Sequence, residues 1–490
     1  MSELLVEDNK EPTLLQALIP IVFLITLLSI NVGIFGDASL DGSNQIVLIL
    51  SAAVATIVAL QVGFDWSTLQ EGIVRSISSA MGSILILLLI GSLAGTWLLS
   101  GIVPAMIYYG LQILNPTIFL FAACIVCAIV SIATGSSWTT AATVGIALMG
   151  IGKALGLSDG IIAGAILSGA YFGDKMSPLS DTTNLAPAMA GTDLFTHIRY
   201  MTYTTVPSIS IALVLFLIIG LTQDVGAAST DTTPILAAIS DKFYISGWLF
   251  IVPIIVIVLI VKKTPAIPAL LIGTLLGAVF ALIFQPDRVA EISGIVGAKG
   301  MYIGIMQSLF GDISVTTDNA MVNELLSSGG MAGMLGTIWL ILSAMIFGGV
   351  MERAKFLKRI AAAIISFVNS TGSLIASTVG TCVFFNVTAS DQYLAIVVPG
   401  RMYSDIYRNK GLAPENLSRS LEDSGTVTSV LIPWNTCGAY HSKVLSVPTL
   451  EYLPFCFFNL ISPFMTILYG FMGWKIRELK KQVETQLKAA

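Results

Sequence analysis

A short polar segment interrupts one of the most apolar stretches of this sequence. It reads Gly173-Asp174-Lys175-Met176-Ser177-Pro178-Leu179-Ser180-Asp181-Thr182-Thr183-Asn184. A charge at the centre of a bilayer costs on the order of 3 kcal/mol, so carboxylates at such a depth usually form pairs or line a pathway. Carboxylate, hydroxyl and amide oxygens are also ligands that small hard cations prefer. The segment therefore predicts a site for a cation or a proton inside an apolar environment.

Asp174 and Asp181 are the leading candidates to carry the ion, with neutral oxygens supplied by Ser180, Thr182 and Asn184. A carboxylate that binds either a proton or a sodium ion is sufficient to exchange one for the other. The alternative is that Asp174 and Lys175 only neutralise each other and stabilise the fold. Because adjacent residues on a helix do not face each other, we expect Lys175 to meet a partner elsewhere.

Two further groups of polar residues lie where glycine or small residues break an apolar stretch. They predict the tips of two re-entrant hairpins and supply further candidate ligands, which are Thr134, Ser136 and Ser137 in the first half and Asn386, Thr388 and Asp391 in the second. The alternative role for these residues is helix capping, because serine, threonine, asparagine and aspartate commonly begin helices.

A second polar segment, residues 423–436, is the counterpart of the first. It supplies Thr426, Asn435 and Thr436 as candidate neutral ligands. Glu422 and Asp423 lie at its start, with Arg419 one turn away, so a structural salt bridge there is as well supported as a role in coupling. The first half is thus expected to supply the coupling carboxylates, and the second half is expected to supply mostly neutral ligands.

The composition indicates that these segments lie in a membrane. Hydrophobic residues make up 55% of the 490, charged residues only 11%, and the mean hydropathy is +0.87. A soluble domain carries roughly a quarter charged residues. Apolar runs near the length of about 20 residues that crosses a bilayer recur throughout. The acidic N-terminus lacks the basic region of a secretory signal, and the modest net charge of −5 gives no sign of nucleic-acid binding.

The predicted fold is an all-α polytopic membrane protein with two inverted-topology repeats. Each repeat has five crossings, one of which is a discontinuous helix, together with a re-entrant hairpin, as in secondary transporters. Interrupted apolar segments at 117–152 and 158–190 match those at 372–402 and 413–440. The expected organisation is a cytoplasmic N-terminus (1–13), a first repeat (14–222), an extracytoplasmic linker (223–245), a second repeat (246–474) and a cytoplasmic tail (475–490).

The distribution of basic residues agrees with this arrangement. If both termini are cytoplasmic, most of the 24 lysines and arginines fall on the cytoplasmic side, as the positive-inside rule requires. Lys175 falls within the membrane. His197 and His441 fall at predicted membrane edges and are expected at the surface, and Asp312 and Asp318 are expected in a solvated outer loop.

Enzyme motifs are missing from the sequence. Its two histidines lie in distant segments and cannot form HExxH, and no P-loop is present. The five cysteines lie in apolar stretches, where packing is their expected role. We therefore expect neither an enzyme nor a bound cofactor.

Several of these segments resemble the NhaC family of bacterial sodium/proton antiporters. The resemblance rests on residues 134–138, 164–187, 191–198, 423–438 and 448–454 and extends over roughly residues 10–475. It implies exchange of sodium, or lithium, for protons across the bacterial inner membrane by a homodimer. One branch of the family resembles malate-2H+/Na+-lactate antiporters, so organic acids remain an alternative cargo. No arginine falls in the predicted core, which favours exchange of cations alone.

Overall fold

The protein is described by a computed structural model that covers residues 11–35, 38–39, 42–113, 115–222, 233–262, 264–317, 320–366 and 368–479. Parts of the predicted N-terminal segment, linker and tail (1–10, 223–232 and 480–490), together with Asp318, lie outside the described residues. Asp312 is exposed, as expected.

The first half of the chain is a series of helices that ends in two interrupted segments and a long crossing. These elements are α1 (Leu14–Phe35), α2 (Ser43–Val62), α3 (Trp66–Leu99), α4 (Ile102–Ile113), α5 (Pro116–Thr134), α6 (Ser137–Thr140), the π-helix η2 (Ala141–Gly145), α7 (Ile146–Ala154), α8 (Asp159–Met176), α9 (Asp181–Ala190) and α10 (Leu194–Thr222). The long helices α3 and α10 begin with polar turns that precede their apolar runs.

The second half begins within the predicted linker, which contains a helix. Its elements are α11 (Thr233–Lys242), η3 (Gly247–Phe250), α12 (Ile251–Val261), α13 (Ala266–Phe284), α14 (Pro286–Ser293), α15 (Ala298–Phe310), β1 (Ile313–Ser314), α16 (Ala320–Leu325), β2 (Ser327–Ser328), η4 (Ala332–Met334), α17 (Leu335–Arg353) and α18 (Phe356–Ile365). The two short strands pair antiparallel, with Ile313 opposite Ser328.

The remaining elements form the second hairpin, the second broken helix and the last crossing. They are α19 (Thr371–Thr388), α20 (Leu394–Asn409), α21 (Pro414–Leu421), the π-helix η5 (Glu422–Thr426), η6 (Ser429–Leu431), α22 (Thr436–Leu445), α23 (Thr449–Tyr452), η7 (Leu453–Phe455) and α24 (Phe457–Met472).

The chain is an all-α multi-pass membrane protein. Among the described residues, eight helices are long and apolar enough to cross a bilayer, and the number rises to 11 if each of three sharply bent helix pairs counts as one span. One of these pairs is residues 286–293 and 298–310, bent by 82°. Interruptions of this kind in a membrane are tolerated where protein or a polar cavity satisfies the freed backbone groups.

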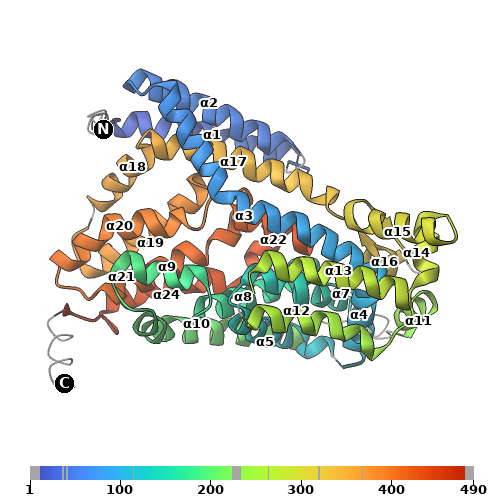
Figure 1. Cartoon of the computed structure of the whole chain (residues 1–490). Helices are drawn as coiled ribbons and strands as arrows, with labels where there is room; N and C mark the ends of the chain where they lie inside the picture. The colour runs from blue at the N-terminus through green and yellow to red at the C-terminus, as the bar shows by residue number, and fades with distance from the viewer. Residues whose placement is uncertain are drawn as a thin grey trace.

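The order of elements in the first half recurs in the second. The helix pairs α1–α2 and α12–α13 correspond, as do the hairpins α5–α7 and α19–α20 and the broken helices α8–α9 and α21–α22. Packing follows the same correspondence, since α2 contacts α17 while α13 contacts α3, and α5 contacts α10 while α19 contacts α24. Figure 1 shows α1, α2, α17 and α18 together along one edge of the molecule. The exact repeat boundaries and the inverted orientation stay predictions.

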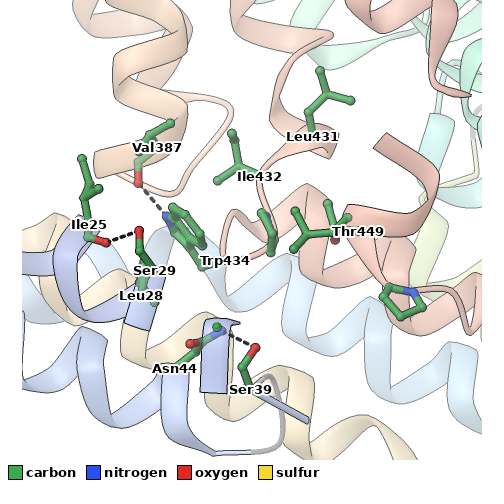
Figure 2. Close-up of a pocket in the computed structure, with 14 residues that line it drawn as sticks. Ile25, Leu28, Ser29, Ser39, Asn44, Val387, Leu431, Ile432, Trp434 and Thr449 are labelled. Carbon is green, nitrogen blue, oxygen red and sulfur yellow. Dashed lines mark hydrogen bonds between the residues drawn. The ribbon is translucent and has the colours of Figure 1, made fainter. Parts of the chain in front are cut away.

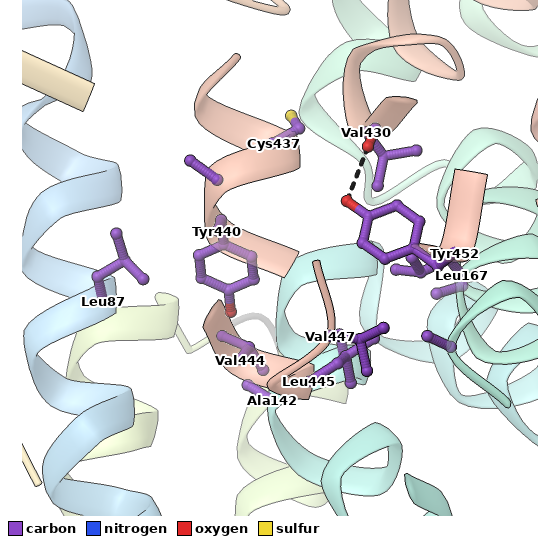
Figure 3. Packing of buried hydrophobic residues seen from close by; sticks show 14 of the residues in the cluster. Leu87, Ala142, Leu167, Val430, Cys437, Tyr440, Val444, Leu445, Val447 and Tyr452 are labelled. Carbon is purple, nitrogen blue, oxygen red and sulfur yellow. Dashed lines mark hydrogen bonds between the residues drawn. The ribbon is translucent and has the colours of Figure 1, made fainter. Parts of the chain in front are cut away.

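Close helix contacts hold the broken helices in place. A Cβ on Gly169 of α8 would lie 2.0 Å from the carbonyl oxygen of Cys124 on α5, so only glycine permits this approach. Around the second break, apolar side chains pack tightly against Tyr440 and Tyr452 (Figure 3). The Tyr452 hydroxyl donates to the Val430 carbonyl at 2.9 Å and so satisfies a backbone group beside the break.

Candidate functional site

The first broken helix places Asp174 at the end of α8 and Asp181 at the start of α9. Pro178 lies between them and lacks the amide hydrogen that a continuous helix would need. The Thr183 hydroxyl donates to the carbonyl oxygens of Asp174 (3.2 Å) and Lys175 (3.1 Å), and Ser180 accepts from the Thr183 amide at 3.4 Å. Ser180 therefore caps α9.

The first hairpin tip docks onto Asp174. Gly135 turns the chain with a φ of 70°, a left-handed conformation that favours glycine. The amide and the hydroxyl of Ser137 then both donate to Asp174 Oδ2, at 3.0 and 2.6 Å. Asp174 Oδ1 is buried and has no hydrogen-bond partner among the described residues. One oxygen of the carboxylate is thus held in place, and the other is left available to a ligand.

Asp181 is exposed and contacts the other half of the chain. Its Oδ2 accepts a hydrogen bond from the hydroxyl of Tyr393, which lies at the second hairpin tip. Asp391 shapes this tip, because its Oδ1 accepts from the Leu394 amide at 2.9 Å and caps α20. Ser390 beside it has a φ of 58°.

Both aspartates line one cavity of about 310 Å³. It lies between α3, the start of α13, the first broken helix and the two hairpin tips. Its lining residues are Ser83, Ile86, Gly135, Ser136, Trp138, Asp174, Leu179, Asp181, Ala266, Gln392, Tyr393, Thr436 and Cys437. These lining residues, all in the described part of the chain, include two carboxylates and no lysine, arginine or histidine. The cavity therefore favours a cation over an anion.

Several predicted ligands lie away from this cavity. Some are occupied with structural hydrogen bonds: Asn435 donates to Asn386 at 3.2 Å, Thr388 donates to the Phe384 carbonyl at 2.7 Å, and Asn184 donates to the Ser180 carbonyl at 2.6 Å. Thr134 and Asp391 are buried and do not line the cavity. Thr182 and Thr426 face the interior beside Glu422.

Lys175 has the distant partner that its position predicts. Its ammonium group forms a fully buried ion pair with Asp423 and also donates to the Ser462 hydroxyl at 3.1 Å. Thr204 donates to the second oxygen of Asp423 at 2.8 Å. This pair joins the two broken helices and neutralises the charge of Asp423. From the sequence, Arg419 was the candidate partner of Asp423.

Three polar residues lie deeper than the sequence predicted. His197 and His441 are fully buried rather than at the surface; their Nδ1 atoms contact the Ser418 hydroxyl and the Cys437 carbonyl, both at 2.8 Å. Arg419 is also fully buried, with its guanidinium 4.7 Å from the centre of the Tyr200 ring. The expectation of a core without arginine is wrong, although Arg419 does not line the cavity that contains the aspartates.

A second cavity, of about 610 Å³, lies beside the second break and α1. Trp434 crosses this region and donates to the Val387 carbonyl at 2.7 Å (Figure 2). The side chains that line this cavity are mostly apolar and include no carboxylate among the described residues. Of these two cavities, the one at the first break contains the carboxylates.

Residues 169–474 match the Na+/H+ antiporter family. The chain is 38% identical over 431 residues to the Na(+)/H(+) antiporter NhaC of Alkalihalophilus pseudofirmus, covering 88% of this chain and 90% of that protein. The chain belongs to the Na+/H+ antiporter family. It is also 36% identical to the malate-2H(+)/Na(+)-lactate antiporter of Bacillus subtilis (95% and 96% coverage) and 35% identical to an arginine/ornithine antiporter of Halobacterium salinarum (96% and 94%). Membership of this antiporter family indicates a transporter rather than a catalytic enzyme.

Sequence reasoning missed several residues of the cavity, namely Tyr393, Gln392, Trp138 and Cys437. The Trp138 ring stacks on Tyr440 with 3.8 Å between ring centres. Gln392 and Tyr393 directly follow Asp391 at the predicted second tip, so their position in the sequence was an available signal. Nothing in the sequence indicates that Tyr393 would reach Asp181.

Proposed function

We propose that this member of the Na+/H+ antiporter family exchanges sodium ions for protons at Asp174 and Asp181. The observation that carries the proposal is the pair of aspartates in one cavity that no cationic side chain lines in the described structure. Buried carboxylates need a compensating positive charge. Either a proton or a sodium ion can supply it, and competition between the two couples their movements.

The geometry assigns different parts to the two aspartates. Asp174 is buried with one oxygen held by Ser137 and the other free of partners, so it is the principal proton and sodium carrier. Asp181 is exposed at the cavity and held by Tyr393, so it attracts the cation and completes the site. Ser136 and Thr436 supply neutral oxygens.

Organic acids are the alternative cargo, because relatives of similar identity are named for sodium, malate and lactate, or arginine and ornithine. A dicarboxylate needs a cationic side chain or helix N-termini at its site. Lys175 is bound to Asp423, and Arg419 lies against Tyr200, so neither offers its charge to the cavity. This arrangement supports cation exchange.

The protein is further proposed to act by alternating access in the bacterial cytoplasmic membrane, as a homodimer with both termini cytoplasmic. The positive-inside distribution of basic residues supports this orientation.

Proteoliposomes with an imposed pH gradient test the function. Sodium chloride added without any organic acid should collapse the gradient, and neither malate, lactate nor ornithine should be required. In Asp181→Asn, half-maximal exchange should need about tenfold more sodium, the equivalent of about 1.4 kcal/mol of lost cation attraction. Asp312→Asn, which removes an exposed carboxylate outside the cavity, should behave as wild type. Exchange that depends on malate or ornithine would replace this proposal with the corresponding alternative.

A further inference from the structure

Glu422 is a buried carboxylate that the proposed exchange at Asp174 and Asp181 does not use. It begins the π-helix η5, and none of its surface is exposed. Its Oε1 accepts from the Thr182 hydroxyl at 3.1 Å, and its Oε2 has no partner among the described residues. A buried carboxylate in this state requires a proton or a cation to balance its charge.

Within the described ranges of the chain, no side chain forms an ion pair that provides that balance. Lys175 is near Glu422, but its ammonium group is bonded to Asp423, so that pair is already neutral. Arg419, one turn before Glu422, packs against the Tyr200 and Tyr469 rings. Among the described ion pairs, none includes Glu422.

Two hydroxyl groups lie next to the Glu422 carboxyl group. Thr426 lies one turn further along η5, next to the Glu422 carboxyl group, and its Oγ1 is also buried without a partner among the described residues. Thr182 contributes a second hydroxyl. Glu422 and Thr426 belong to one π-helical turn, and such turns occur frequently at functional sites. Carboxylate, hydroxyl and carbonyl oxygens together are the ligands of a sodium-sized cation.

A chain of oxygens connects this cluster with the cavity. Ser180 lies next to the carboxyl group of Asp174. The Ser180 and Thr182 hydroxyl oxygens are 3.1 Å apart, and the Thr182 hydroxyl donates to Glu422 Oε1 at 3.1 Å. An ion at Asp174 is thus separated from Glu422 by two hydroxyl groups.

We propose that Glu422, Thr182 and Thr426 form a second, occluded site for a monovalent cation, deeper than the Asp174 and Asp181 cavity. This proposal rests on the proposed function and adds a second sodium ion to it. A single uncompensated carboxylate sets the charge of the ligand at one.

Counting bound sodium tests this site. Radioactive sodium is titrated onto the purified full-length protein at fixed ionic strength, with choline chloride as the balancing salt. Wild type should bind two sodium ions per chain and Glu422→Gln one. Glu415→Gln is the matched control, because Glu415 is equally buried on the adjacent α21 but is paired with Arg477; it should still bind two.

A milder variant covers the case in which Glu422→Gln does not fold. Thr426→Val keeps the side-chain volume and removes only the hydroxyl. It should therefore lower the affinity for one of the two sodium ions by about tenfold. One sodium ion per wild-type chain, with unchanged affinity in Glu422→Gln or Thr426→Val, would overturn the second site and leave the proposed function standing. Wild type that binds no sodium would refute the proposed function itself.

Discussion

Replacing Asp174 with asparagine is expected to abolish sodium-dependent proton movement and to leave the fold intact. The asparagine side-chain oxygen can still accept both hydrogen bonds from Ser137. It cannot take up a proton or attract a cation by charge, so the exchanged ions lose their common binding group. The measurement is the sodium-induced collapse of a pH gradient in proteoliposomes, together with the thermal unfolding midpoint.

The matched control is Asp391→Asn. Asp391 is also a buried carboxylate near a hairpin tip, but it caps α20 and does not line the cavity. Asparagine is a good capping residue, so this variant should retain exchange. Equal loss in both variants, or a normal sodium response in Asp174→Asn, would contradict the assignment of Asp174.

The largest loss of stability is expected from breaking the ion pair between Lys175 and Asp423. Removing one partner of a fully buried pair leaves an uncompensated charge and costs about 3–5 kcal/mol. Lys175→Met should therefore lower the free energy of unfolding by this amount, measured by denaturant titration in detergent. The double variant Lys175→Met/Asp423→Asn should recover most of the loss, because no charge is then left unpaired.

An exposed pair provides the control for this prediction. A distance of 3.7 Å separates Arg353 Nη2 from Glu71 Oε2, and both side chains are exposed. Such pairs contribute at most about 1 kcal/mol to the free energy of unfolding. Arg353→Met should thus change stability little. If the double variant is as unstable as Lys175→Met, the pair does not act through its charge, and the account of how the two broken helices are joined would be wrong.

Local sequence predicted the first half of the site well. The polar segment between Gly173 and Asn184 must break an apolar helix, because Pro178 removes an amide hydrogen and the aspartates require polar surroundings. The paired hairpins and broken helices follow from the same local signals, and all four appear as interrupted helices in the structure.

Contacts between distant segments could not be predicted in this way. Tyr393 and Asp181 are separated by 212 residues, and Lys175 and Asp423 by 248. The burial of His197, His441 and Arg419 depends on which helices pack over them, which hydropathy does not encode. For Glu422 the sequence left open a structural salt bridge or a role in coupling, and its burial shows that the second half also brings a carboxylate to the interior.

Sodium-induced proton release tests the central claim most directly, which is that both ions compete for the aspartates of the first break. Sodium chloride is added to weakly buffered, purified protein, and the pH is recorded with choline chloride as the reference. Wild type should release protons as sodium binds, and Asp174→Asn should release markedly fewer. Sodium binding without proton release in wild type, or equal release in Asp174→Asn, would contradict exchange at this site.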